Sequence, residues 1–101
     1  MAQDTERDKM LRGEWYDANF DEALLKERLT AERYCYTFNQ AMPGSEEQQE
    51  ALKNLLGGEI PDGLSVRAPV YFDYGGTRTE LGAGTFVNHG AYFMDGGGIT
   101  I

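Results

Sequence analysis

The sequence lacks several features of secreted and membrane proteins. Its single cysteine, Cys35, excludes a disulfide within the chain and favours a reducing compartment. No apolar run approaches the roughly 20 residues that a membrane-spanning helix needs. The charged N-terminus, MAQDTERDKM, contains no apolar segment typical of a signal peptide. We therefore expect a cytoplasmic protein with no membrane partner.

Basic residues and metal ligands are also scarce. Nine Lys and Arg residues stand against 17 acidic residues, for a formal net charge of −8, and no basic cluster offsets this locally. Such a surface repels phosphate backbones, so we expect no nucleic acid partner. The only histidine, His89, lies far from Cys35 in the sequence and gives no zinc-ligand spacing. No metal site is predicted.

The first half of the chain has the pattern of helices with caps. Serine, threonine and acidic residues mark helix starts, while glycines mark helix ends. Apolar residues recur at helical spacing between these signals. The predicted helix starts are Thr5 with Asp8, then Asn19 or Asp21, then Ser45 in a capping box with Gln48. The predicted ends are Gly13, Asn39 and Gly57-Gly58 in the same order. The predicted apolar face of the second helix is Leu24, Leu25, Leu29, Ala31, Cys35 and Phe38, and that of the third is Ala51, Leu52, Leu55 and Leu56.

The second half has a different pattern. Nine of the 13 glycines lie at or after Gly63, and the turn-rich segment 57–63 forms the boundary. Large apolar residues then recur every six positions, at Leu81, Val87, Phe93 and Ile99. A short strand and a tight turn together use six residues, and three such units form a triangular coil of a parallel β-helix. Periodicity alone leaves this β-helix and an irregular glycine-rich β-meander both open.

Four segments together resemble a known family. They are MLRGEWYDA, ERLTAERYCYTFN, RAPVYFDYGG and LGAGTFVNHGAYFMDGGGITI. Their order and spacing are similar to the maltose, galactoside and nodulation acetyltransferases. The resemblance implies an α+β fold. A helical cap of the maltose-acetyltransferase type would occupy residues 1–58. The first coils of an incomplete left-handed parallel β-helix, built from hexapeptide repeats, would occupy residues 63–101.

The resemblance implies acetyl transfer from acetyl-CoA to a sugar hydroxyl. Family members are usually homotrimers, with active sites between adjacent β-helices. A histidine acts as general base on the acceptor hydroxyl, and hydrogen-bond donors stabilise the oxyanion. That histidine and the CoA contacts come after the position matching Ile101. We therefore expect this chain to resemble the N-terminal portion of such an enzyme, with no catalytic residue, no bound cofactor and no activity of its own.

The same resemblance assigns four residues to the sugar acceptor. Asp17 matches an aspartate of the leader, and Asp73 a position where members have Asp or Ser. Asn88 matches an asparagine that positions the acceptor and the base, and Asp95 falls at or beside an acidic position of the pocket. The segment GGTRTELG is one residue longer than the family pattern, which predicts a bulge that displaces Asp73.

Each of these residues also has a plainer interpretation. Asp17 could be a surface carboxylate beside a core residue, Trp15, and Asn88 could occupy a corner with left-handed backbone angles. Asp73 and Asp95 would suit a glycosidase pair if they faced one another. His89 has no recognisable orienting partner, which favours a structural role. Cys35 is most simply a small core residue.

A second hypothesis is a non-catalytic truncated protein that binds or assembles. The last coil of a β-helix exposes an unpaired stack, and terminal repeats normally need a cap. A chain of this kind is expected to bury that end against another copy of itself, to rearrange, or to aggregate.

Overall fold

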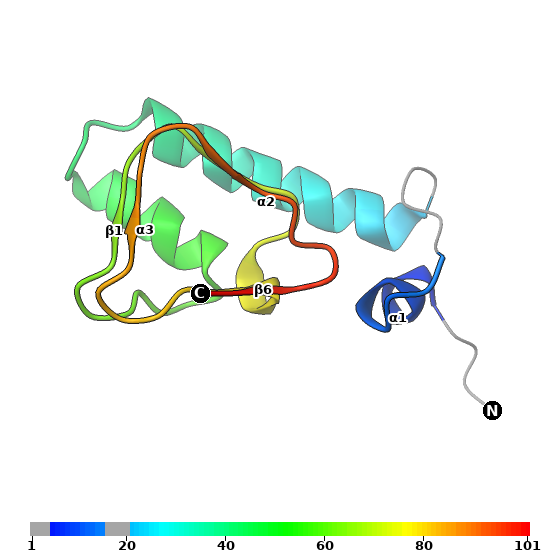
Figure 1. The fold of residues 1–101 in the computed structure, drawn as a ribbon. Coiled ribbons are helices and arrows are strands. Elements are labelled where there is room, and N and C mark those ends of the chain that lie inside the picture. The colour runs from blue at the N-terminus through cyan, green and yellow to red at the C-terminus, as the bar shows by residue number, and fades with distance from the viewer. Residues whose placement is uncertain (1–4, 16–20) are drawn as a thin grey trace.

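The computed structural model describes residues 5–15 and 21–101. A helical part precedes a part made of short strands (Figure 1). The elements in chain order are α1 (Glu6–Leu11), α2 (Glu22–Gln40), α3 (Glu46–Leu55), β1 (Ser65–Val66), β2 (Val70–Phe72), the 3₁₀ helix η1 (Gly76–Arg78), β3 (Thr79–Glu80), β4 (Phe86–Val87), β5 (Ala91–Phe93) and β6 (Ile99–Thr100).

Side-chain caps start the helices where the sequence predicts them. The Thr5 hydroxyl accepts the Asp8 backbone N–H at 3.0 Å, and the Asp8 carboxylate accepts the Thr5 N–H at 3.2 Å. These reciprocal bonds form the predicted capping box. At α2, the Asp21 carboxylate accepts the Leu24 N–H at 2.9 Å. Asp21, rather than Asn19, is therefore the N-cap of α2.

The cap of α3 differs in one detail from the prediction. Ser45 accepts the Gln48 N–H at 3.2 Å, as expected for an N-cap. The Gln48 side chain does not return to Ser45; its Oε1 accepts the Gly44 N–H at 2.9 Å, and its Nε2 donates to the Phe38 carbonyl at 3.4 Å. Gln48 is buried. It therefore satisfies a backbone group of the loop before α3 and one of α2, and holds α3 against the end of α2.

The buried stripe of α2 is narrower than predicted. Leu24, Ala31, Cys35 and Phe38 are buried, whereas Leu25 and Leu29 are exposed. At 3.6 residues per turn, the two exposed leucines lie four positions apart on a neighbouring face of the helix. The prediction that they belong to the core stripe is wrong.

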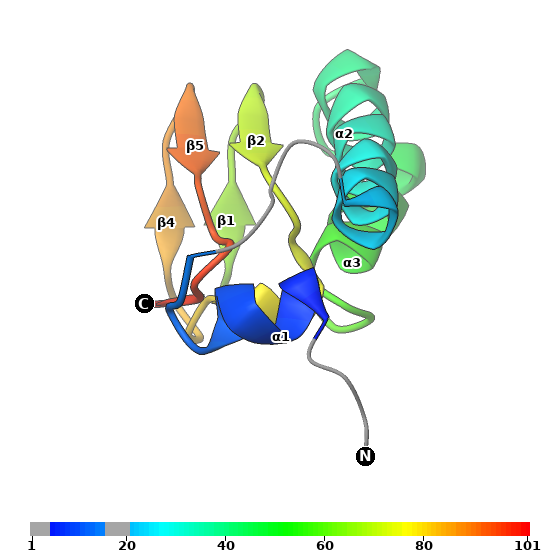
Figure 2. The same cartoon turned by 90° about the vertical axis from the view of Figure 1, so that its right-hand side faces the viewer.

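The strands pair only in parallel among the described residues. β1 pairs with β4, β2 with β5, and β3 with β6. The first pass of the chain (β1, β2 and β3) is therefore followed by a second pass (β4, β5 and β6) whose strands pair with it in the same order. Figure 2 shows β4 beside β1 and β5 beside β2. A meander would place consecutive strands antiparallel. The meander alternative is therefore wrong for this part of the chain.

The six-residue period marks side chains that point into the core. Val87 and Phe93 are buried in different sheets, and each pairs with its counterpart from the first pass, Val66 or Phe72. The rings of Phe72 and Phe93 stack with centroids 4.7 Å apart and planes 9° from parallel. This core is continuous with buried residues of α2 and α3, which lie beside the first pass (Figure 2).

The additional residue of GGTRTELG is accommodated after Asp73. Gly75 precedes η1 and Gly76 begins it, with φ values of 66° and 60°. The Asp73 N–H still donates to the Phe93 carbonyl at 3.0 Å, which extends the pairing of β2 with β5. The pairing therefore continues through Asp73, while its displacement relative to the family pattern stays a prediction.

Candidate functional site

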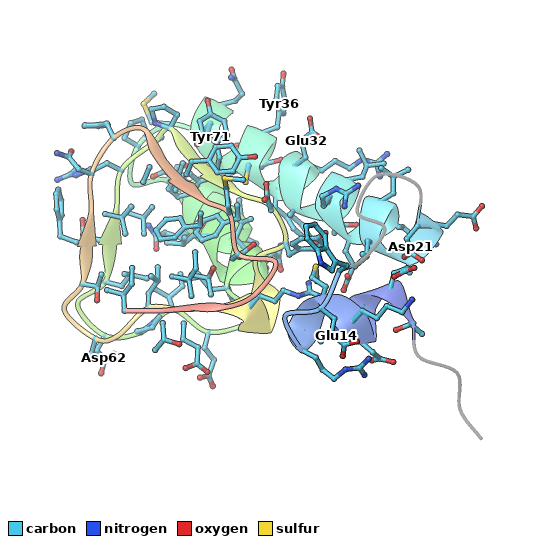
Figure 3. The ribbon with its side chains drawn as sticks, turned by 45° about the vertical axis from the view of Figure 1, so that its right-hand side comes forward. Glu14, Asp21, Glu32, Tyr36, Asp62 and Tyr71 are labelled. Atoms are coloured by element: carbon cyan, nitrogen blue, oxygen red, sulfur yellow. The ribbon has the colours of Figure 1, made fainter. Side chains whose placement is uncertain are left out.

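A groove of about 470 Å³ lies between α2 and the outer face of the β2–β5 sheet. It combines carboxylates, an arginine, an asparagine and three tyrosines. In Figure 3, Glu32 and Tyr36 on α2 and Tyr71 on β2 project from the same side of the molecule. The groove is lined by Arg28, Glu32, Cys35, Tyr36, Asn39, Gln40, Tyr71, Phe72, Asp73 and Tyr92.

Asp73 is the predicted site residue that the structure places in this groove. It follows β2 directly, and its Oδ1 accepts a hydrogen bond from the Tyr92 hydroxyl at 2.7 Å. That hydrogen bond, with smaller contributions from burial and from the negative charge of Asp73, raises the pKa of Tyr92. The neutral phenol is thereby stabilised as a donor. Tyr92 of β5 thus fixes the Asp73 carboxylate, which follows β2, by a hydrogen bond.

Arg28 and Asn39 are groove residues that the sequence analysis did not identify. The Arg28 Nη1 donates to the Tyr74 hydroxyl at 3.0 Å, and its guanidinium lies 5.9 Å from the centroid of that ring. The Asn39 side chain bonds to the backbone of Val70. Tyr71 and Tyr92 were also missed, although each is the outward residue between two inward ones on its strand. That alternation was the signal that could have found them.

Tyr74 forms a buried junction next to Asp73. Its ring packs with Met10 of α1 and Leu24 of α2, and the Arg78 guanidinium lies 4.5 Å from its centroid. Arg78 also pairs with Glu27 at 3.1 Å, and Arg7 pairs with Glu27 at 3.2 Å. These contacts dock α1 against α2 and fix the chain immediately after Asp73.

Asp95 is 0% exposed and lies outside the groove lining. Its Oδ1 accepts the Tyr74 N–H at 2.8 Å, and its Oδ2 accepts the Gly75 N–H at 2.9 Å and the Thr79 hydroxyl at 2.6 Å. A buried carboxylate requires such donors. This placement gives an acceptor no accessible oxygen, and it does not support a glycosidase pair with Asp73. Asp95 instead ties the second pass to the turn after β2.

Asn88 lies at the exposed corner between β4 and β5. Its Oδ1 accepts the His89 N–H at 2.8 Å, and the His89 Nδ1 contacts the Ala68 carbonyl oxygen. No described residue other than glycine has a positive φ, and at this corner Gly90 takes that conformation, with φ of 85°. The left-handed interpretation of Asn88 is therefore wrong. Neither Asn88 nor His89 lines the groove of its own chain.

Asp17 lies outside the described residues. Its neighbour Trp15 is described, and this side chain is 98% exposed. The interpretation that placed Trp15 in the core is therefore wrong. Within residues 5–15 and 21–101, no helix has both the length and the apolar character needed to cross a membrane. The same residues contain no group of three or more His, Cys, Asp or Glu side chains placed to hold a metal ion.

The helical part matches a family model described as the maltose acetyltransferase hexapeptide capping motif, over residues 9–58. The chain therefore carries the maltose acetyltransferase capping motif over about half of its length. A protein of Staphylococcus haemolyticus named "Putative acetyltransferase SH0499" is 44% identical over 92 residues, which cover 91% of this chain and 47% of that protein. The chain spans about half the length of the curated relatives that it matches.

Solved structures show the same fold relationship. A hexapeptide-repeat acetyltransferase of Vibrio cholerae, crystallised with acetyl coenzyme A, superposes with a TM-score of 0.79 at 28% identity, covering 97% of this chain and 51% of that one. A galactoside acetyltransferase in complex with coenzyme A gives a TM-score of 0.83 at 22% identity, covering 97% of this chain and 48% of that one. At this identity the second likeness concerns the fold alone.

Proposed function

We propose that this chain forms the acceptor-side part of an acetyl-CoA-dependent sugar O-acetyltransferase. Residues 1–58 would form its cap, and residues 63–101 the first coils of a left-handed parallel β-helix. The position of Asp73 carries the proposal: its carboxylate lies in a groove between the capping helix α2 and the strands β2 and β5. The structural neighbours bind acetyl-CoA or CoA, which supports acetyl-CoA as the donor.

The groove has the chemistry that sugar binding requires. A carboxylate accepts hydrogen bonds from sugar hydroxyls, while tyrosine rings contact the apolar C–H face of a sugar ring. Asp73 and Arg28 provide the polar groups beside Tyr71 and Tyr92. Asp17 is assigned to the same acceptor. Asn88, which is exposed and does not line this groove, is assigned to positioning the acceptor and the base.

Catalysis also requires a histidine base and a CoA site, which in the family lie after the position that matches Ile101. There a histidine base would take the proton of the acceptor hydroxyl as its oxygen attacks the acetyl carbonyl. Acetyl-CoA supplies the acetyl thioester, and the CoA thiolate leaves. The residues of this chain would bind and orient the hydroxyl before that step. Orientation of this kind lowers the entropic cost of bringing two reactants together.

We assign the protein to the cytoplasm as a homotrimer. The single buried cysteine is consistent with a reducing compartment. Phe86 and Met94 on the second pass are exposed apolar side chains, as is Ile101 after β6. Exposed large apolar side chains favour association with another protein surface.

Binding and turnover measured together test this proposal. The chain is incubated with maltose, glucose and galactosides, and binding is followed by ligand-observed NMR, with acetyl transfer from acetyl-CoA assayed in parallel. We expect sugar binding that Asp73→Ala abolishes, and no transfer above background. If none of the sugars binds, the acceptor role is contradicted. Robust transfer by the chain alone would contradict the assignment of the base to another segment.

A non-catalytic assembly module is the second candidate. The exposed apolar side chains Phe86, Met94 and Ile101 favour it, because their burial against another copy would remove apolar surface from water. Light scattering tests this candidate directly. A monodisperse oligomer that binds none of the sugars would favour assembly as the function, whereas a trimer that binds them would favour the acceptor role.

A further inference from the structure

Tyr71 and Tyr92 are aromatic residues on the outer face of the strands. They occupy equivalent positions, since Tyr71 pairs in register with Tyr92. Their ring centroids are 5.8 Å apart, with planes 30° from parallel. Tyr71 is 43% exposed and Tyr92 is 60% exposed. The two rings therefore form a stacked aromatic surface that solvent reaches.

The core does not account for this stack. Phe72 and Phe93, the next residues on the same strands, point inward and stack on each other within the core. Backbone pairing between β2 and β5 holds the strands together independently of the outer rings. Both tyrosines line the groove that contains Asp73, and Tyr36 of α2 lines it as well. The aromatic surface thus faces the candidate ligand site.

The hydroxyl of Tyr92 gives the stack a second property. It donates to Oδ1 of Asp73 at 2.7 Å, which fixes the direction of that carboxylate. A carboxylate has further acceptor sites when one oxygen is engaged in this way. Asp73 can therefore receive a hydroxyl of a ligand that rests on the rings. The same residue supplies an apolar contact and orients the polar one.

We propose that Tyr92 is a positioning and specificity residue, which orients Asp73 and forms with Tyr71 a platform for cyclic sugars. The inference rests on the proposed acceptor function of the groove. The expected ligand of the groove is a pyranoside, because a closed sugar ring presents a C–H face to the tyrosines while its hydroxyls reach Asp73. An acyclic polyol offers the same hydroxyls without that face. The groove would bind it more weakly.

Three variants separate the two roles of Tyr92. Tyr92→Phe keeps the ring and removes the donor, Tyr92→Leu removes both, and Asp73→Asn removes the charge that the phenol faces. Met42→Ala is the control, since Met42 is an exposed apolar residue that neither lines the groove nor belongs to the apolar side chains assigned to association. Circular dichroism confirms that each variant is folded before binding is measured.

Affinities for methyl glucoside, methyl galactoside and maltose are measured by ligand-observed NMR, with sorbitol as the acyclic probe. We expect wild type to prefer the pyranosides, Tyr92→Phe to weaken their binding about fivefold, and Tyr92→Leu to weaken it further. Met42→Ala is expected to bind like wild type. Equal binding of sorbitol and the pyranosides overturns the platform, as does unchanged pyranoside affinity in Tyr92→Leu.

A spectroscopic readout tests the hydrogen bond itself. The chain is labelled with ¹³C at the tyrosine Cζ, the Tyr92 resonance is identified from its loss in Tyr92→Phe, and its titration is followed over the pH range in which the fold persists. We expect the pKa of Tyr92 to fall in Asp73→Asn. An unchanged titration rejects the positioning role even if sugars bind. Failure of all sugars to bind wild type instead rejects the proposed acceptor function.

Discussion

The side-chain amide of Asn39 pairs with the backbone of Val70 in both directions. Its Nδ2 donates to the Val70 carbonyl at 3.0 Å, and its Oδ1 accepts the Val70 N–H at 2.9 Å. Asn39 lies in the last turn of α2, and Val70 begins β2. The amide therefore pairs with the β2 backbone as a neighbouring strand would, and it joins the end of α2 to β2 beside the groove.

Replacing Asn39 with Asp should separate these two elements. A carboxylate has no N–H to donate and would place a negative charge against the Val70 carbonyl. We expect a loss of about 2–3 kcal/mol in the free energy of unfolding, measured with urea at neutral pH. Gln40→Glu is the control, because it adds the same charge one residue later on an exposed side chain. Equal stability of the two variants would show that the amide pairing contributes little.

Gly75 and Gly76 provide a matched pair for the turn after β2. Both have positive φ, but a Cβ on Gly75 would lie 2.6 Å from the Leu55 carbonyl oxygen, whereas one on Gly76 would meet no atom within 4 Å. We expect Gly76→Ala to lose about 1–2 kcal/mol from backbone strain alone. Gly75→Ala should lose clearly more, because α3 and the turn must also move apart. Urea unfolding compares them, and similar losses would contradict this close approach.

Asp95 is predicted to stabilise the stacking of the two passes. Asp95→Ala would leave the Tyr74 and Gly75 N–H groups without their acceptor, and we expect a loss of about 3 kcal/mol. Asp62→Asn, on an exposed side chain, is the control and should change stability by less than about 0.5 kcal/mol. Amide hydrogen exchange provides a local readout. Tyr74 and Gly75 should lose protection first, and unchanged protection would exclude the proposed role of Asp95.

Cys35 should react slowly with thiol reagents in the folded chain. Burial is the main cause that raises the pKa of this thiol above 9.0, although the Phe72 N–H donates to its Sγ and opposes the shift. We expect modification at pH 8 to be at least about tenfold slower in buffer than in urea, because the thiolate is the reactive form. The control is Asp62→Cys in a Cys35→Ala background, whose exposed thiol should react quickly both in buffer and in urea.

The direction of this shift also sets a dependence of stability on pH. A thiol with a raised pKa in the folded state favours folding below its ordinary pKa, and this contribution is lost as the pH rises toward the folded value. The unfolding free energy of wild type should therefore fall above about pH 9 more steeply than that of Cys35→Ala. Parallel curves for the two proteins would contradict the raised pKa.

Local sequence patterns predicted the helices and the inward residues of the strands. Helix starts depend on contacts between residues three apart, so Thr5 and Asp21 can be identified from the sequence. The six-residue period identified Val87 and Phe93 as core positions for a similar reason, since each short strand and turn repeats the same local geometry. The failure at Leu25 and Leu29 arose because composition alone does not choose which face of a helix is covered.

The tertiary structure decided the composition of the candidate site. Tyr92 meets Asp73, and Asp95 meets Tyr74, because the register of β5 on β2 brings residues about 20 positions apart into hydrogen-bond contact. The same register placed one predicted acceptor residue in a groove and buried another. Sequence determined where the chain coils and turns, through interactions between near neighbours. Which carboxylate meets solvent depended on how the passes and helices pack, and only three-dimensional contacts set that arrangement.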